Sequence, residues 1–238
     1  ETLEAFEKAK AKNAEIACVS SGGKLIELAK AQNLNYIQLA TGDSPRAMMG
    51  YSITQLLYVL NHYGLISDGF KNELNKTASL IDELQEEIQA DAEKMTNHLF
   101  GKIPIIYACD GYKGMAVRFT QQLAENSKML SWHNIIPEMN HNELVGWRTK
   151  NENLAVVFFR NETDHKRNQK RIEINSEVVS KYTSSVMEYW SKGDSMIEKT
   201  FYLINVCDHV SFNLSKRNNV IVEEIEVINY LKGELAKF

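Results

Sequence analysis

Apolar runs of strand length alternate with helical patterns along this 238-residue chain, and this alternation limits the possible folds more than any other feature. A short apolar run bounded by turn residues predicts a buried strand, and helix periodicity between such runs predicts βαβ units. Such connections are right-handed crossovers, so the strands should lie parallel. The sequence therefore predicts an α/β fold, with strands expected at residues 14–21, 36–40, 102–109, 154–160 and 184–190.

Three long helices are expected between and after these strands. Residues 46–64 are apolar nearly all round, which predicts a helix buried on every side. Residues 71–100 carry apolar side chains at three- and four-residue spacing, so we expect one long polar helix that bridges two halves of the chain. Another helix is expected at residues 196–217, and a last one closes the chain.

Composition excludes some partners. A net charge of -4 and the lack of a dense Lys/Arg tract argue against nucleic acid, and no apolar run is long enough for a membrane span. The one basic run, at residues 165–171, is expected to be the solvated outer face of a helix. Cys18, Cys109 and Cys207 lie far apart in apolar segments, which is typical of buried free thiols in a cytoplasmic protein.

The loops after the first two strands contain candidate ligand contacts, because ligands of parallel sheets bind outside the carboxyl ends of the strands. The first loop is Ser20, Ser21, Gly22, Gly23 and Lys24, where small residues let backbone amides approach an anion, although a simple helix cap and tight turn is an equally open interpretation.

In the second loop, Arg46 follows Pro45 at the start of the expected helix 46–64. Its positive charge opposes the helix dipole there, and a bound anion would explain it. A surface salt bridge to Asp43 is the alternative.

A polar stretch from Glu125 to His141 and Glu143 lies at the junction of an expected helix and a loop. Apolar residues flank it, which argues against full exposure. Glu125 on a last helical turn and His141 on the following loop could face one another across a pocket, as a carbon-acid base and a proton shuttle. A solvated Glu and a surface His are the alternative interpretation.

Three runs around this stretch resemble the bifunctional phosphoglucose/phosphomannose isomerases of the sugar isomerase (SIS) superfamily. They are AVRFTQQLAENSK, IIPEMNHNELVGW and VVFFRNETDHKRNQKRIEI, and the similarity extends across essentially the whole chain. The resemblance implies three-layer SIS-type domains with parallel sheets. It places the end of a first domain and linking helices at residues 1–88, and a second domain at residues 89–238.

The resemblance also implies a reaction, an isomerisation of glucose or mannose 6-phosphate to fructose 6-phosphate through a cis-enediol. Glu125 would move the proton between C2 and C1, His141 would assist ring opening, and Arg46 would stabilise the enediolate. No metal or other cofactor is implied. A homodimer is implied, because the counterpart of His141 reaches the neighbouring subunit's site.

Further substrate contacts are implied at Asn142 and Glu143, and on the late helix at His209, Ser211 or Lys216. His209 and Ser211 are two residues apart, so at most one of them should point into the site. An ordinary amphipathic helix surface explains these three residues equally well. We also weighed a non-catalytic SIS-type sugar-phosphate-binding module and a metal hydrolase built on His141 to Glu143, whose ligand spacing is wrong for a helical zinc motif.

The chain has no initiator Met and opens directly on an amphipathic helix. A helix with no strand before it in an α/β fold leads us to expect that the first domain is truncated at its N-terminus. The main phosphate-binding loops of the family would then be absent, and we expect weak or no turnover from the chain alone.

Overall fold

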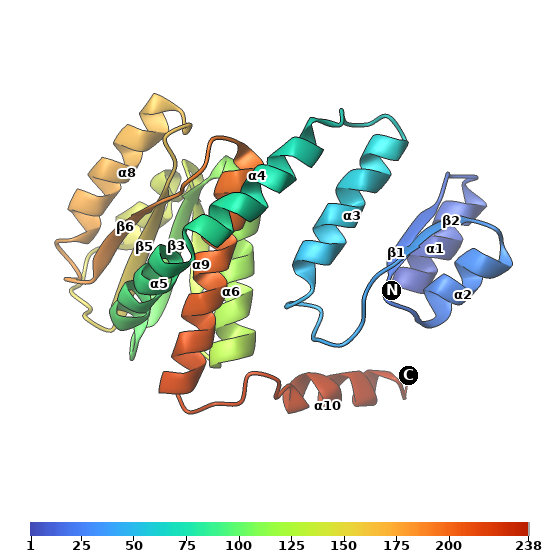
Figure 1. The fold of residues 1–238 in the computed structure, drawn as a ribbon. Helices are drawn as coiled ribbons and strands as arrows, with labels where there is room; N and C mark the ends of the chain where they lie inside the picture. The colour runs from blue at the N-terminus through green and yellow to red at the C-terminus, as the bar shows by residue number, and fades with distance from the viewer. Residues whose placement is uncertain (238) are drawn as a thin grey trace. The chain divides into compact units, whose positions relative to one another are not determined.

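The computed structural model describes residues 1–237, which form two compact units, Glu1–Lys71 and Asn72 onward (Figure 1). Each unit has a parallel sheet of its own, so the predicted α/β class and parallel pairing are confirmed. The predicted domain boundary after residue 88 stays a prediction, and by internal contacts the division falls after Lys71. Within residues 1–237 no helix is long and apolar enough to cross a membrane.

The first unit is one βαβ arrangement with a helix on either side of it in the chain. Strands β1 and β2 are parallel, with Ala17 opposite Asn35. A small core forms around Phe6, Cys18 and Ala29. The elements are α1 (Thr2–Ala11), β1 (Ala17–Ser20), α2 (Gly23–Ala31), β2 (Asn35–Gln38) and α3 (Met49–His62), with α4 (Gly69–Glu83) beginning at its end.

The prediction that helix 46–64 is buried on every side is wrong. Helix α3 has no buried residue, and Tyr51, Leu56 and Tyr58 are each 43% exposed or more. A helix that is apolar all round needs neighbours on all sides, and a two-stranded sheet is too narrow to supply them. The apolar composition of residues 46–64 therefore correctly indicates a helix but does not indicate that this helix is buried.

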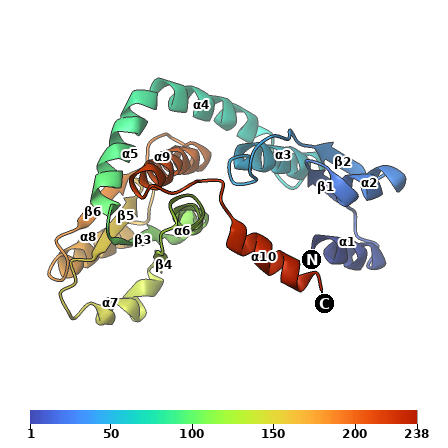
Figure 2. The ribbon, with the colours of Figure 1, turned by 90° about the horizontal axis from the view of Figure 1, so that it is seen from below.

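The second unit is a three-layer sandwich around a parallel sheet of strand order β4-β3-β5-β6 (Figures 1 and 2). Its regular elements are α5 (Gln85–Leu99), β3 (Ile103–Cys109), η1 (Asp110–Tyr112), α6 (Lys113–Ser127), β4 (Trp132–Ile136), η2 (Glu138–His141), α7 (Glu143–Gly146), β5 (Leu154–Arg160), α8 (Lys166–Val179), β6 (Val186–Trp190), α9 (Met196–Arg217) and α10 (Glu226–Leu235).

Alternate residues of the central strands pack on opposite faces of this sheet. Tyr107 and Phe158 join the core cluster that contains Ile172 of α8 and Met139 of η2. On the other face, Phe159 contacts the ring of Phe119 on α6, at 6.1 Å between centroids. Helix α8 and the η2–α7 segment therefore cover one face, whereas α6 covers the other, with α9 packed against α6.

Two predictions about regular elements in this unit are corrected. The expected single helix 71–100 is two helices, α4 and α5, separated at Leu84, which no Pro or Gly signals in the sequence. The sequence predicts no strand at residues 132–136, yet these residues form strand β4, which pairs with β3 at the edge of the sheet. An edge strand need not be apolar throughout, and the polar residues His133 and Asn134 interrupt the apolar run by which a strand would be recognised in the sequence.

The predictions of free, buried cysteines and of a solvated basic run are confirmed. All three cysteines are free and buried, and burial raises the pKa of the thiols of Cys18, Cys109 and Cys207. Lys166, Arg167 and Lys170 are exposed on α8, while Ile172 beside them is fully buried. The run is therefore the solvated face of a helix.

Gly193 provides a stability test. It lies before α9, its φ is +109°, and its surroundings leave little space for a side chain. A Cβ there would lie 2.5 Å from Cβ of Glu198 and 3.1 Å from Leu80. We expect Gly193→Ala to lower the free energy of unfolding by about 1–3 kcal/mol, from backbone strain and overpacking together. Denaturant unfolding measures it.

Gly114 in the first turn of α6 is the matched control, since nothing lies within 4 Å of a Cβ added there. Gly114→Ala should leave stability unchanged or raise it by about 0.5–1 kcal/mol, because Ala favours helix. Equal losses for the two variants would contradict the strain argument.

Candidate functional site

Glu125 lies on the last turn of α6, as the sequence predicted, and is half-buried. It lines a cavity of about 470 Å³ together with residues that follow α6 and residues at the start of α10. The other lining residues are Ala124, Lys128, Met129, Leu130, Glu224, Ile225, Val227 and Ile228. Most of these side chains are apolar, so the residue borders a largely apolar space.

Polar contacts with α9 fix the helix end that carries Glu125. Asp208 accepts hydrogen bonds from Arg118 at 2.7 Å and from Gln122 at 2.9 Å. One turn further along, Asn126 donates to the hydroxyl of Ser211 at 2.9 Å. Gln122, Asn126 and Ser211 are buried, and polar groups paired in this way hold two elements in one register.

Ser211 is therefore part of the helix interface. It is fully buried, its hydroxyl contacts Asn126, and its carbonyl accepts from the hydroxyl of Ser127 at 2.7 Å. His209 lies on another side of α9, where its Nε2 is 3.4 Å from Nε2 of Gln85 on α5. Lys216 is exposed, with its ammonium 4.2 Å from the centroid of the Phe212 ring. The expectation that His209 and Ser211 point in different directions agrees with these contacts.

His141 ends the short helix η2 and is exposed. The next residue, Asn142, caps α7, because its side chain accepts from the amide of Glu143 at 2.6 Å. Asn142 also donates to the carboxylate of Glu138 at 2.9 Å. These bonds on either side of His141 set the position of its backbone.

Glu143 ties this loop back to the sheet. Its carboxylate accepts from Tyr107 at 2.5 Å, from the indole of Trp132 at 3.1 Å and from Asn134 at 2.6 Å. Burial, together with this bond to Glu143, raises the pKa of Tyr107 far above its usual range, so its hydroxyl remains a donor. Both carboxylate oxygens of Glu143 are occupied, which suits an anchor better than a group that binds substrate.

The elements that carry Glu125 and His141 lie on opposite faces of strand β4. His133 of β4 faces α6, with its Nδ1 3.4 Å from the Thr120 hydroxyl, and the next residue, Asn134, faces Glu143 of α7. The cavity beside Glu125 does not include His141. Figure 2 shows α6 and α7 on either side of β4.

The two side chains also lie towards opposite ends of β4. Helix α6 ends shortly before the strand begins, and η2 follows its last residue. Five residues at about 3.3 Å each give β4 a length of roughly 16 Å. One chain therefore does not bring the Glu125 carboxylate and the His141 imidazole together.

In the first unit, Ser20, Ser21, Gly22, Gly23 and Lys24 run from the end of β1 into α2. The Ser20 hydroxyl donates to the carbonyl of Gly22 at 3.1 Å, and the carbonyl of Ser21 accepts from Gln38. Gly23 has a φ of +71°, which glycine adopts without strain. Its neighbour Gly22 is the N-cap of α2 and has no side chain to cap it, so the first amides of α2 can serve an anion.

Arg46 is half-buried and lies in the segment that connects the carboxyl end of β2 to the start of α3. Because β1 and β2 are parallel, this segment and the Ser20–Lys24 loop both follow strands at the same edge of the small sheet. That agrees with the sequence argument for placing ligand contacts there.

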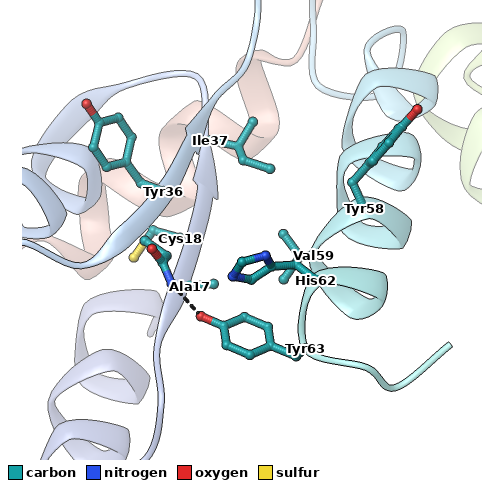
Figure 3. A pocket seen from close by; sticks show the side chains of 9 residues that line it. Ala17, Cys18, Tyr36, Ile37, Tyr58, Val59, His62 and Tyr63 are labelled. Carbon is teal, nitrogen blue, oxygen red and sulfur yellow. Dashed lines mark hydrogen bonds between the residues drawn. The ribbon is translucent and has the colours of Figure 1, made fainter. Parts of the chain in front are cut away.

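The first unit also contains a cavity that includes none of the predicted site residues. It measures about 350 Å³ and lies between β1, β2 and α3 (Figure 3). The Tyr63 hydroxyl accepts from Asn35 there at 2.8 Å and donates to Glu15 at 3.2 Å. Within residues 1–237, no cluster of three or more His, Cys, Asp or Glu residues could hold a metal ion.

Comparison with known proteins identifies relatives along the whole chain. The family of the bacterial phospho-glucose isomerase C-terminal SIS domain matches residues 88–235. A bifunctional phosphoglucose/phosphomannose isomerase from Caldicellulosiruptor bescii is 33% identical, over 100% of this chain and 73% of its own length. The enzyme of the same name from Aquifex aeolicus is 29% identical, over 100% of this chain and 72% of its own length.

A solved structure agrees in fold. A hypothetical protein from Thermus thermophilus superimposes with a TM-score of 0.77 at 12% identity, over 99% of this chain and 66% of that one. The family match covers well over half of the chain, and the identity to the Caldicellulosiruptor enzyme extends from end to end. This chain belongs to the family of the bifunctional phosphoglucose/phosphomannose isomerases.

Proposed function

We propose that the protein is an aldose–ketose isomerase that interconverts glucose 6-phosphate or mannose 6-phosphate with fructose 6-phosphate. Its family membership supports the reaction class. The observation that supports this site is the position of Glu125. Its carboxylate borders a cavity, and contacts with α9 hold in register the helix end that carries it. A base held in one place is what proton transfer at carbon requires.

In the proposed mechanism, Glu125 takes the proton from C2 of the open-chain sugar and returns it to C1. His141 moves protons on the ring oxygen and O1, which assists ring opening. Arg46 stabilises the negative charge of the enediolate. Glucose and mannose differ only at C2 and meet in one enediol, so one base can serve both sugars.

We further propose a homodimer with shared active sites. Strand β4 separates Glu125 from His141 within one chain, so the chain's own imidazole is badly placed to assist its own base. In a two-fold dimer the partner subunit's His141 would complete each site, and both sites would be equivalent.

The remaining substrate contacts are proposed according to whether the polar atoms of each residue already have hydrogen-bond partners within the chain. We propose the Ser20–Lys24 loop at the start of α2 as an anion contact, and Asn142, His209 and Lys216 as candidates for the sugar. Ser211 and Glu143 have their polar atoms engaged in the fold, so a structural role is favoured for both. The three buried free thiols support a reducing compartment such as the cytoplasm.

Mixing two inactive variants tests the shared site. In the protein expressed from its complete gene, Glu125→Gln and His141→Asn should each lower kcat by about 10²–10⁴-fold, the usual contribution of a general base or acid. Unfolded together and refolded, the two variants should recover about a quarter of wild-type activity, since about half of the dimers are mixed and each holds one intact site. A coupled assay of fructose 6-phosphate formation measures it.

Each variant refolded alone is the control for this experiment. No recovery on mixing would exclude a site shared between subunits. Wild-type activity in Glu125→Gln would show that another group is the base.

Removing the Glu143 carboxylate separates anchoring from substrate binding. Glu143→Ala leaves Tyr107 and Asn134 without their acceptor, so we expect a loss of about 1–3 kcal/mol in unfolding free energy. Because the same anchor holds the His141 loop, kcat should fall as well. Denaturant unfolding and the coupled assay measure the two effects.

The matched control is Glu177→Ala, since Glu177 is exposed and forms a surface ion pair with Lys181. It should leave both stability and kcat close to wild type. A raised KM at unchanged stability in Glu143→Ala would instead indicate direct substrate contact.

A further inference from the structure

Lys128 has an unusual position directly after the helix that carries Glu125. Its backbone is left-handed, with φ 55° and ψ 39°, a region that non-glycine residues rarely adopt. Its ammonium donates to three carbonyls, those of Glu125 at 2.6 Å, Val222 at 3.3 Å and Glu224 at 2.8 Å. All three hydrogens of the ammonium thus have acceptors.

The three carbonyls come from two distant parts of the chain. That of Glu125 belongs to the last turn of α6, where a positive charge interacts favourably with the helix dipole. Those of Val222 and Glu224 belong to the segment between α9 and α10, almost one hundred residues later. One side chain therefore joins the end of α6 to the C-terminal segment.

That segment forms a wall of the cavity beside the proposed base. Ile225, Val227 and Ile228 line the cavity together with Glu125. Within residues 1–237, helix α10 has no buried residue, and Val227 and Tyr230 are 80% and 70% exposed. Apolar packing within the described chain thus contributes little to holding this wall in place. The hydrogen bonds from Lys128 to the residues before α10 therefore contribute more.

We propose that Lys128 is a positioning residue of the isomerase. By binding both backbones it keeps the C-terminal segment closed against the end of α6 and fixes the Glu125 carbonyl, and through it the carboxylate, in the wall of the cavity. The catalytic part of this inference rests on the proposed function. The closure itself does not.

Three variants test the inference in the protein expressed from its complete gene. Lys128→Met removes the ammonium and keeps a long unbranched stem. Lys128→Arg keeps a cation with several donors. Lys170→Met removes an exposed lysine paired with Glu173 and is the matched control for loss of one charge.

Two measurements are made on each variant, namely hydrogen exchange of the amides in residues 221–226, and kcat and KM for fructose 6-phosphate formation. Lys128→Met should speed exchange by about tenfold or more, because charged hydrogen bonds are lost. It should lower kcat by about tenfold and leave KM within about twofold, as expected for a displaced base. Lys128→Arg should restore most of both properties, and Lys170→Met should match wild type.

If hydrogen exchange of the amides in residues 221–226 is unchanged in Lys128→Met, Lys128 does not hold the C-terminal segment against α6, whatever the value of kcat. Faster exchange with unchanged kcat would overturn the positioning role. Full activity in Glu125→Gln would overturn the proposed base alone, since the exchange measurement does not depend on catalysis.

Discussion

The parallel pairing of β3 with β4 on one side and β5 on the other determines the rest of the second unit. Once β3 is central, its alternate residues must face opposite layers, and each crossover must return along one face. Helix α6 returns along the face of Phe159, whereas η2 and α7 fold over the face of Tyr107. The separation of Glu125 from His141 is a consequence of that pairing and not of any local preference.

The parts of the fold that were predictable from sequence are those where one local signal agrees with its surroundings. The strands predicted at 102–109 and 154–160 are apolar except for Lys102 and Arg160, and the observed β3 and β5 lie in the centre of the sheet and are mostly buried. The helix end at Glu125 was predictable too, because the apolar pattern of α6 stops there. Strand β4 was not, since at a sheet edge two of its five residues are polar and serve as links to neighbouring layers.

The features of the candidate site that could not be predicted from the sequence depend on residues far apart in the chain. The resemblance implies Glu143 as a substrate contact, and only the structure shows that its carboxylate has three partners on β3 and β4. The resemblance offers Ser211 as one of three candidates on the late helix, and only the position of α6 shows that this residue is buried. A Lys just past a helix end was a visible signal at Lys128, but its partners beyond residue 220 were not predictable from local sequence.

The contacts between α6 and α9 fix the position of α6 along its own axis. The donors on α6, Arg118, Gln122 and Asn126, recur every fourth residue and form one stripe. A slide of α6 by one turn, about 5.4 Å, would bring each donor opposite the wrong acceptor and leave Asp208 or Ser211 unmatched. The end of α6 that carries Glu125 is therefore held in register with α9, so a shift of α6 by one turn along its axis would require α9 to shift with it.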